Sequence, residues 1–209
     1  MKVNEIFLSI QGESIYAGYP TVFVRFSGCN LRCSYCDTAY AYEDGEYMTP
    51  EEIFLEIGRY SYKRVCLTGG EPLLQKEIGE LLKLLENYSV TIETNGSLPI
   101  EAHELKHGHS FVMDMKCPSS GFSQYMLLNN FKFLSQNDEI KFVIGSKEDY
   151  NWAKAIIKEN YKAGIITFSP VFGRIEYTDL INWILEDKLE VRFQIQLHKL
   201  IWGPDKRGV

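Results

Sequence analysis

Apolar positions along the chain follow two alternating patterns. Short runs rich in apolar and β-branched residues predict buried strands, and stretches with apolar residues three and four positions apart predict helices. Strand and helix alternate about six times, which is typical of a mostly parallel sheet with crossover helices. Strands are expected at residues 21–26, 64–69, 89–94, 110–116, 138–145, 164–170 and 190–199.

Two of the expected helices carry start signals. Thr49 is placed as an N-cap, with Pro50 in the first turn and Glu52 completing a capping box. Ser146 is the expected N-cap of a second helix, with Asp149 in its first turn. Further helices are expected at 76–87 and 177–188, with a short helix or turn at 99–106.

The number of strand–helix units bears on the architecture. About six units are fewer than the eight of a closed barrel, which favours a partial (β/α)6-type barrel. No repeat, low-complexity tract or linker divides the sequence. Residues 1–209 are therefore expected to form one compact α/β domain.

Composition narrows the choice of partners and compartment. The formal net charge of −6 does not favour a general nucleic-acid surface, because phosphate binding needs clustered cations. No apolar run approaches the roughly 20 residues of a membrane span. Polar residues also interrupt the N-terminal segment, so it does not resemble a signal peptide. We expect a cytoplasmic protein that binds neither nucleic acid nor membrane directly.

Polar residues follow several of the expected strands. In a mostly parallel sheet the carboxyl ends of the strands lie at one edge and carry the functional loops. We therefore expect these residues to form one shared site. The segments concerned are 68–71, 94–96, 114–116 and 169–170.

Three of the five cysteines are closely spaced as C-x-x-x-C-x-x-C, at Cys29, Cys33 and Cys36. Structural zinc sites and ferredoxin-type clusters each require four protein ligands, and Cys66 and Cys117 are expected to be small core residues instead. Three thiolates fit an iron–sulfur cubane with one iron left open. Such an iron can bind a chelator that carries an amine and a carboxylate, and S-adenosylmethionine carries both.

The cysteine spacing resembles that of the radical S-adenosylmethionine superfamily. Tyr35 precedes the third cysteine, as an aromatic residue often does in that superfamily. The sequence TGGEP at 68–72 resembles its glycine-rich element, where glycine lets the backbone approach the methionine part of the cofactor. The resemblance implies a [4Fe–4S] cluster that passes an electron to S-adenosylmethionine and so generates a 5′-deoxyadenosyl radical.

A longer stretch, residues 9–38, resembles the 7-carboxy-7-deazaguanine synthase family of deazapurine (queuosine) biosynthesis. It reads SIQGESIYAGYPTVFVRFSGCNLRCSYCDT, and TGGEPLLQ, IETNGSLP and QIQLHK extend the similarity over nearly the whole chain. The resemblance implies conversion of 6-carboxy-5,6,7,8-tetrahydropterin to 7-carboxy-7-deazaguanine by radical ring contraction, with loss of ammonia and regeneration of S-adenosylmethionine. It also implies Mg²⁺, an electron donor such as flavodoxin or ferredoxin, and a homodimer.

The same resemblance assigns roles to individual residues. Arg25 is expected to grip the pterin carboxylate through a bidentate pair. Glu13 could accept from a ring N–H or order its loop, and Glu93 and Asn95 could equally be loop-ordering residues. The implied cluster ligands are Cys29, Cys33 and Cys36, with Thr38 for Mg²⁺; the implied substrate-binding residues are Ile10, Gln11, Gly12, Glu13, Arg25 and Thr68; the implied cofactor-binding residues are Gly70, Glu71, Asp114, Lys116 and Ser169.

Two other functions remain open from the sequence. Small activases that make a glycyl radical on a partner protein share the cysteine motif, but they need no arginine that grips a carboxylate. A non-catalytic zinc or iron–sulfur module would require a fourth protein ligand, which the sequence does not supply at any repeated spacing. Among the remaining polar residues, His103, His107 and His109 are expected at the surface, and His198 is expected to pack or hydrogen-bond near the site in the last strand. Lys206 and Arg207 could face either the pocket or solvent, and solvent is favoured.

Overall fold

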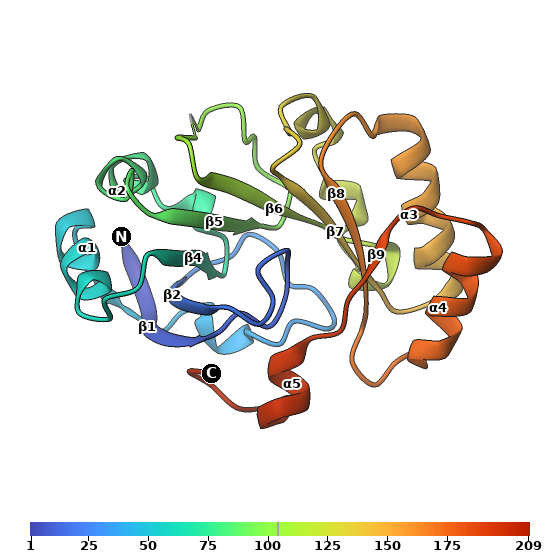
Figure 1. Ribbon diagram of the computed structural model, residues 1–209, viewed down its shortest axis with the longest axis horizontal. Coiled ribbons are helices and arrows are strands. Elements are labelled where there is room, and N and C mark those ends of the chain that lie inside the picture. The colour runs from blue at the N-terminus through green and yellow to red at the C-terminus, as the bar shows by residue number, and fades with distance from the viewer. Residues whose placement is uncertain (104) are drawn as a thin grey trace.

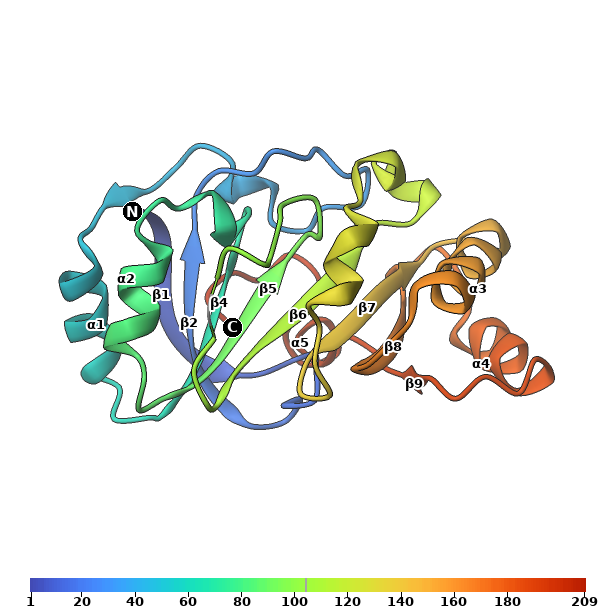
Figure 2. The same ribbon diagram turned by 90° about the horizontal axis from the view of Figure 1, so that it is seen from above.

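The computed structural model describes residues 1–103 and 105–209, and contains one curved sheet flanked by helices (Figure 1 and Figure 2). The strands are β1 Lys2–Ile10, β2 Pro20–Phe26, β3 Glu46–Tyr47, β4 Arg64–Gly69, β5 Ser89–Thr94, β6 His109–Met115, β7 Glu139–Ile144, β8 Ile165–Pro170 and β9 Arg192–Phe193. The α-helices are α1 Pro50–Gly58, α2 Ile78–Leu84, α3 Lys147–Asn160, α4 Tyr177–Glu186 and α5 Leu197–Trp202. Short 3₁₀ helices are η1 Ala39–Ala41, η2 Pro72–Leu74, η3 Pro118–Ser120, η4 Ser123–Tyr125 and η5 Leu128–Lys132.

The strands form one sheet in the order β3-β1-β2-β4-β5-β6-β7-β8-β9. Neighbours from β2 onward pair in parallel, whereas β1 is antiparallel to β2 and β3 is antiparallel to β1. Because β3 and β9 do not pair with each other, the sheet stays open, and the predicted partial barrel is confirmed. In Figure 1, α1 and α2 lie beside one half of the sheet, α3 and α4 lie at the other end, and α5 lies apart from them near the C-terminus.

The predicted N-caps of two helices, Thr49 and Ser146, are confirmed. The Thr49 hydroxyl accepts from the backbone N–H of Glu52 at 3.2 Å, and the Glu52 carboxylate accepts from the backbone N–H of Thr49 at 2.8 Å, so α1 begins with a full capping box. At the start of α3, the Ser146 hydroxyl accepts from the backbone N–H of Asp149 at 3.2 Å. Each cap satisfies N–H groups that would otherwise lack a partner in the first turn.

The core lies between the sheet and its outer helices. Parallel strands that are covered on both faces are apolar along most of their length, and every residue of β7 is buried. Phe142 of β7 and Phe168 of β8 meet edge to face with 5.6 Å between ring centroids, and Tyr150 of α3 packs on Phe168 at 5.9 Å. Cys66 and Cys117 are fully buried, which confirms that they are core residues.

The two ends of the chain differ from the sequence-based prediction. The pattern did not indicate β1, which pairs with both β2 and β3. The strand predicted at 190–199 is wrong, since only Arg192–Phe193 pairs with β8 and Leu197–Trp202 is helical. Gln194 gives the reason: its side chain accepts from the Ser14 backbone N–H at 2.7 Å and donates to the Ser14 carbonyl at 2.8 Å. The chain therefore follows the loop after β1 instead of extending the sheet.

The histidine prediction holds only in part. His109 opens β6, is 6% exposed, and has Nε2 at 3.1 Å from the Leu85 carbonyl oxygen, so its predicted surface position is wrong. His103 is half-buried and His107 is exposed. The predicted helix or turn at 99–106 includes Glu104, which lies outside the described residues. No helix in the described ranges is long and apolar enough to cross a membrane.

Candidate active site

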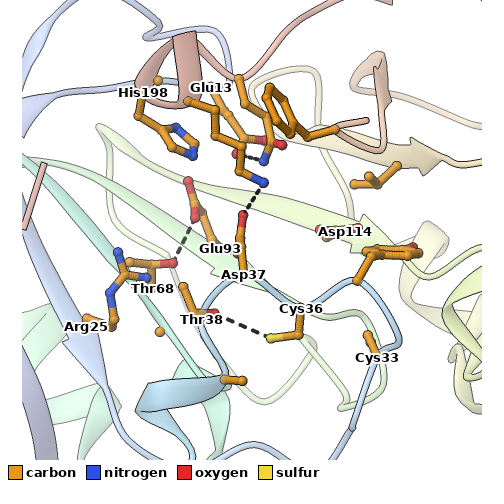
Figure 3. Close-up of a pocket in the computed structure, with 18 of the residues that line it drawn as sticks. Glu13, Arg25, Cys33, Cys36, Asp37, Thr38, Thr68, Glu93, Asp114 and His198 are labelled. Atoms are coloured by element: carbon orange, nitrogen blue, oxygen red, sulfur yellow. Dashed lines mark hydrogen bonds and ion pairs between the residues drawn. The ribbon is translucent and has the colours of Figure 1, made fainter. Parts of the chain in front are cut away.

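A cavity of about 770 Å³ opens at the carboxyl ends of the parallel strands. Figure 3 shows side chains from several strand ends and from the C-terminal segment pointing into it. Three of the four predicted strand-end segments reach this cavity, whereas Ser169 and Pro170 do not border it. The bordering residues fall within 10–13, 29–42, 68–70, 93–95, 171–174, 196–199 and 204–209, together with Phe23, Arg25, Val112, Asp114, Lys116, Lys141 and Val143.

The cysteine loop begins on a glycine contact that leaves no room for a side chain. The Gly28 carbonyl accepts from the Glu71 backbone N–H at 2.8 Å. A Cβ atom at Gly70 would lie 1.9 Å from that carbonyl oxygen, so only glycine fits there. The turn after β4 therefore supports the loop that carries Cys29, Cys33 and Cys36, all of which border the cavity as free thiols.

The three thiols are partly buried. Burial raises the pKa of Cys29 and raises the pKa of Cys33 to about 11, so both are protonated in the metal-free chain. The Cys29 sulfur accepts from the Leu31 backbone N–H at 3.4 Å and from the Asn95 side chain at 3.6 Å. Metal binding deprotonates a coordinating thiol, and hydrogen bonds to the sulfur then stabilise the thiolate.

The donor set fits a cluster better than a single metal ion. Over residues 1–103 and 105–209, no three Cys, His, Asp or Glu side chains converge closely enough to hold one ion. In a [4Fe–4S] cluster each thiolate binds a different iron, so the sulfur atoms need not converge. The three cysteines therefore suit an iron–sulfur cluster with one open position, and they do not suit a four-coordinate structural zinc.

Glu93 connects two of the predicted substrate-binding residues. Its Oε1 accepts from the Gln11 side chain at 3.4 Å, and its Oε2 accepts from the Thr68 hydroxyl at 2.8 Å. Glu93 lies at the end of β5 and borders the cavity. From the sequence alone, Glu93 could equally be a loop-ordering residue. Its position at the carboxyl end of a buried strand was the signal that could have placed it in the site.

A chain of alternating charges crosses one wall of the cavity. Lys141 lies 2.9 Å from Glu13 and 3.5 Å from Asp114, and Asp114 lies 2.9 Å from Lys116. Burial alone would raise the pKa of Glu13, but the charges of Lys141 and His198 lower it to about 2. Glu13 is therefore an ionised acceptor beside the cavity, held by a lysine that the sequence analysis did not single out. A lone lysine within the buried strand EIKFVI was the available signal.

The C-terminal segment closes over the loop that follows β1. The Leu197 backbone N–H donates to the Gly12 carbonyl at 3.1 Å, and the Gln196 side chain donates to Glu13 at 2.8 Å. A Cβ atom at Gly12 would lie 2.3 Å from His198 Nδ1, so glycine is required for this contact. Lys199 pairs with Asp37 at 2.7 Å, which joins the segment to the cysteine loop as well.

Residues near the C-terminus also border the cavity. Lys206 and Arg207 are exposed, as expected, yet both lie at the cavity mouth. The Arg207 guanidinium lies 3.9 Å from the ring centroid of Tyr40, which fixes this part of the segment by a cation–π contact. Thr38 also borders the cavity, with its hydroxyl 3.6 Å from the Cys36 sulfur.

Two of the predicted cofactor-binding residues do not border the cavity. Glu71 is fully buried, and its carboxylate accepts from the Thr94 hydroxyl at 2.8 Å and from the Asn95 backbone N–H at 2.7 Å. It thereby joins the turn after β4 to the end of β5. Ser169 is 1% exposed, and its hydroxyl has no hydrogen-bond partner within the described part of the chain. Cofactor contact by these two side chains stays a prediction.

Comparisons with known proteins agree with this geometry. The sequence model of the Radical SAM superfamily matches residues 23–181. The 7-carboxy-7-deazaguanine synthase of Clostridium acetobutylicum is 49% identical, over 100% of this chain and 99% of the relative. That of Chlorobaculum tepidum is 44% identical, over 100% of this chain and 97% of the relative. The chain belongs to the 7-carboxy-7-deazaguanine synthase family.

The structural comparison leads to the same family. The crystal structure of QueE from Escherichia coli matches with a TM-score of 0.74 and 25% sequence identity, over 94% of each chain. Membership of the radical SAM superfamily implies a [4Fe–4S] cluster and S-adenosylmethionine, and the three cysteines at the cavity suit that cluster. The relatives fit a synthase and not the glycyl-radical activase.

Proposed function

We propose that this chain converts 6-carboxy-5,6,7,8-tetrahydropterin to 7-carboxy-7-deazaguanine, with loss of ammonia, in deazapurine (queuosine) biosynthesis. One observation carries the proposal beyond the family name. A single cavity has the cysteine loop on one side and, across from it, a partly buried arginine next to polar groups (Figure 3). Such a cavity can hold a planar, hydrogen-bonding heterocycle by its carboxylate while its ring faces the cluster.

The residues present suit both cofactors. Cys29, Cys33 and Cys36 would hold the [4Fe–4S] cluster. Asp114 Oδ1 is buried without a partner among the described residues, and Lys116 lies beside it, so this wall offers polar groups to S-adenosylmethionine. When bound there, the two cofactors would supply radical hydrogen-atom transfer chemistry.

The chain itself binds and orients the substrate. The Arg25 side chain is 13% exposed, and its guanidinium matches the two oxygens of a carboxylate. Glu13 is ionised by its contact with Lys141 and accepts from N–H groups of the heterocycle. Gln11 and Thr68, both bound to Glu93, provide further donors and acceptors along the same wall. Binding in a shaped, partly closed cavity fixes the ring relative to the cluster.

The metal, the assembly and the partners form the rest of the proposal. Thr38 would provide a hydroxyl oxygen to Mg²⁺, a hard cation that takes oxygen ligands. Residues 1–209 act as one domain, and two copies form a homodimer. An external donor such as flavodoxin or ferredoxin reduces the cluster in the cytoplasm.

The activity is tested directly with anaerobically purified, cluster-loaded protein. Incubation with 6-carboxytetrahydropterin, S-adenosylmethionine, Mg²⁺ and a reductant should yield the deazaguanine without net loss of S-adenosylmethionine. Arg25→Ala should abolish turnover while iron content stays normal. Arg59→Ala is the matched control, since Arg59 is 75% exposed and pairs only locally with Glu56. Stoichiometric consumption of S-adenosylmethionine with no deazaguanine would defeat the proposal.

A further inference from the structure

The pairing of β1 with β2 contains one irregularity. Val3 lies opposite Phe26, but the next pair is Glu5 opposite Arg25, so the register shifts at Asn4. Regular antiparallel pairing would place Asn4 opposite Arg25. A β-bulge inserts one residue and re-aims the side chains that follow. Directly opposed residues in an antiparallel pair share one face of the sheet, so the bulge places the Glu5 carboxylate beside the Arg25 guanidinium.

The contacts fix the Arg25 side chain from three directions. Arg25 Nε donates to Glu5 Oε1 at 2.8 Å, and the Tyr40 hydroxyl donates to the same oxygen at 3.0 Å. The guanidinium carbon lies 5.8 Å from the ring centroids of both Phe7 and Tyr40. The Nε edge of the guanidinium is therefore engaged, and within the described ranges no hydrogen bond uses its two terminal nitrogens, which leaves them for a ligand.

Glu5 lies behind Arg25 rather than in the cavity. Arg25 and Tyr40 are among the described residues that border the cavity, and Glu5 is not. The Glu5 side chain is 22% exposed, so its removal does not leave a large void in the core. Its contact with Arg25 is thus neither a substrate contact nor a packing contact, which leaves orientation of the guanidinium as its physical effect.

Orientation matters because an arginine can meet a carboxylate in two ways. A side-on pair uses Nε and one terminal nitrogen, and an end-on pair uses both terminal nitrogens. With Nε bound to Glu5, only the end-on pair is open. A guanidinium held in place also loses less rotamer entropy when the ligand binds.

We propose that Glu5 is a positioning residue for substrate recognition, because it holds Arg25 so that its terminal nitrogens meet the substrate carboxylate end-on. The inference rests on the proposed function and adds a residue that determines carboxylate specificity. The bulge at Asn4 is the backbone feature that makes this possible, because it sets the register between Glu5 and Arg25.

The test measures how much of the binding depends on the ligand carboxylate. Cluster-loaded protein with S-adenosylmethionine is titrated anaerobically with 6-carboxypterin and with pterin, which lacks the carboxylate. Glu5→Ala should weaken 6-carboxypterin binding roughly tenfold, the size expected for losing one charge-assisted hydrogen bond, and leave pterin binding unchanged. Glu5→Gln should lose less affinity for 6-carboxypterin than Glu5→Ala, because the amide oxygen can still accept a hydrogen bond from Arg25 Nε.

The control and the folding check use neighbouring positions. Glu46→Ala removes an exposed carboxylate from β3, the strand that pairs with the other edge of β1. It should leave the affinity for both ligands unchanged. Circular dichroism verifies that each variant folds. Glu5→Gln keeps the side-chain size, so it provides the comparison even where Glu5→Ala is unstable.

Each possible result decides the question. If Glu5→Ala still prefers 6-carboxypterin to pterin as the wild type does, or if it binds both ligands equally more weakly, the role of Glu5 is overturned. The proposed function stands in either case. A wild-type protein that binds pterin and 6-carboxypterin equally well would overturn both. Loss of the preference in Glu5→Ala with partial rescue in Glu5→Gln supports the inference.

Discussion

Replacing Lys141 by methionine removes the cation that lies between two buried carboxylates. Lys141 is 7% exposed and lies 2.9 Å from Glu13 and 3.5 Å from Asp114. Methionine has a similar length and no charge, so the cavity wall keeps its shape. Asp114 retains Lys116 at 2.9 Å, whereas Glu13 loses its only cationic hydrogen-bond partner among the described residues. The variant therefore isolates the effect of an unpaired buried carboxylate at Glu13.

The size of the effect follows from the ionisation of Glu13. In the wild-type chain its pKa is lowered from the ordinary value of 4.5 to about 2 against the opposing effect of burial. That difference corresponds to about 3 kcal/mol, since one pKa unit is about 1.36 kcal/mol. Removing one partner of a buried ion pair costs about 3–5 kcal/mol in other proteins. We expect Lys141→Met to lose about 3–5 kcal/mol of unfolding free energy at pH 7.5.

The pH dependence gives a second, independent signature. In the wild type, Glu13 has a lower pKa in the folded state than in the unfolded chain. Its contribution to the free energy of unfolding is therefore fully present above pH 4.5 and is lost as the pH falls toward 2. Without Lys141, burial raises the pKa of Glu13 above its ordinary value. The folded variant then binds more protons than the unfolded chain above pH 4.5, so its stability falls as the pH rises. Between pH 5.0 and 7.5, urea unfolding should show no change in stability from Glu13 in the wild type and a fall in stability with rising pH in the variant.

The double variant Glu13→Gln, Lys141→Met is the matched control. It removes both charges, so it should recover part of the lost stability and lose the pH dependence that arises from Glu13. His198 also faces Glu13, so the difference in slope between Lys141→Met and the double variant is the part that arises from Glu13. A loss below about 1 kcal/mol for Lys141→Met, or an equal loss at both pH values, would refute the reasoning.

Three further predictions follow from single side chains. Gly70→Ala places a Cβ atom 1.9 Å from the Gly28 carbonyl oxygen and should lower the iron content of reconstituted protein several-fold. Gly79→Ala in α2, which has open space around it, should leave the iron content unchanged. Equal iron contents in the two variants would contradict the role of the turn after β4 in supporting the cysteine loop. Asp149 is fully buried and accepts from two backbone N–H groups at 2.8 Å each. Asp149→Ala should therefore lower the free energy of unfolding, measured in urea, by about 3 kcal/mol. A loss below about 1 kcal/mol would be inconsistent with this role. Thr38→Ala should raise the Mg²⁺ concentration needed for half-maximal turnover, while serine at this position should not; an unchanged requirement would exclude Thr38 as a ligand.

The parallel part of the sheet could be predicted because its signal is local. The predicted bounds 64–69 and 89–94 coincide with β4 and β5, since both segments are short runs rich in β-branched residues. The segment 190–199 shows why the rest could not. Its alternating pattern favours a strand, but hydrogen bonds between Gln194 and Ser14, 180 residues apart, direct the chain away from the sheet. No local pattern contains that information.

The site divides in the same way. The three cysteines were identified because their spacing within one loop is itself the signal. Lys141 and Glu5 were not, because their roles depend on contacts across the fold: Lys141 meets Glu13 over 128 residues, and Glu5 faces Arg25 only through the bulge in β1. Sequence reasoning located the chemistry, and the structure added the residues that hold it in position.

The central claim is that three cysteines bind a cluster whose remaining iron is free for S-adenosylmethionine. Electron paramagnetic resonance of the reduced, reconstituted cluster tests it most directly, recorded with and without S-adenosylmethionine. We expect the spectrum to change when S-adenosylmethionine is added, and we expect Cys29→Ser, Cys33→Ser or Cys36→Ser to remove the signal. A spectrum that does not respond to S-adenosylmethionine, from a metal centre with four protein ligands, would contradict it.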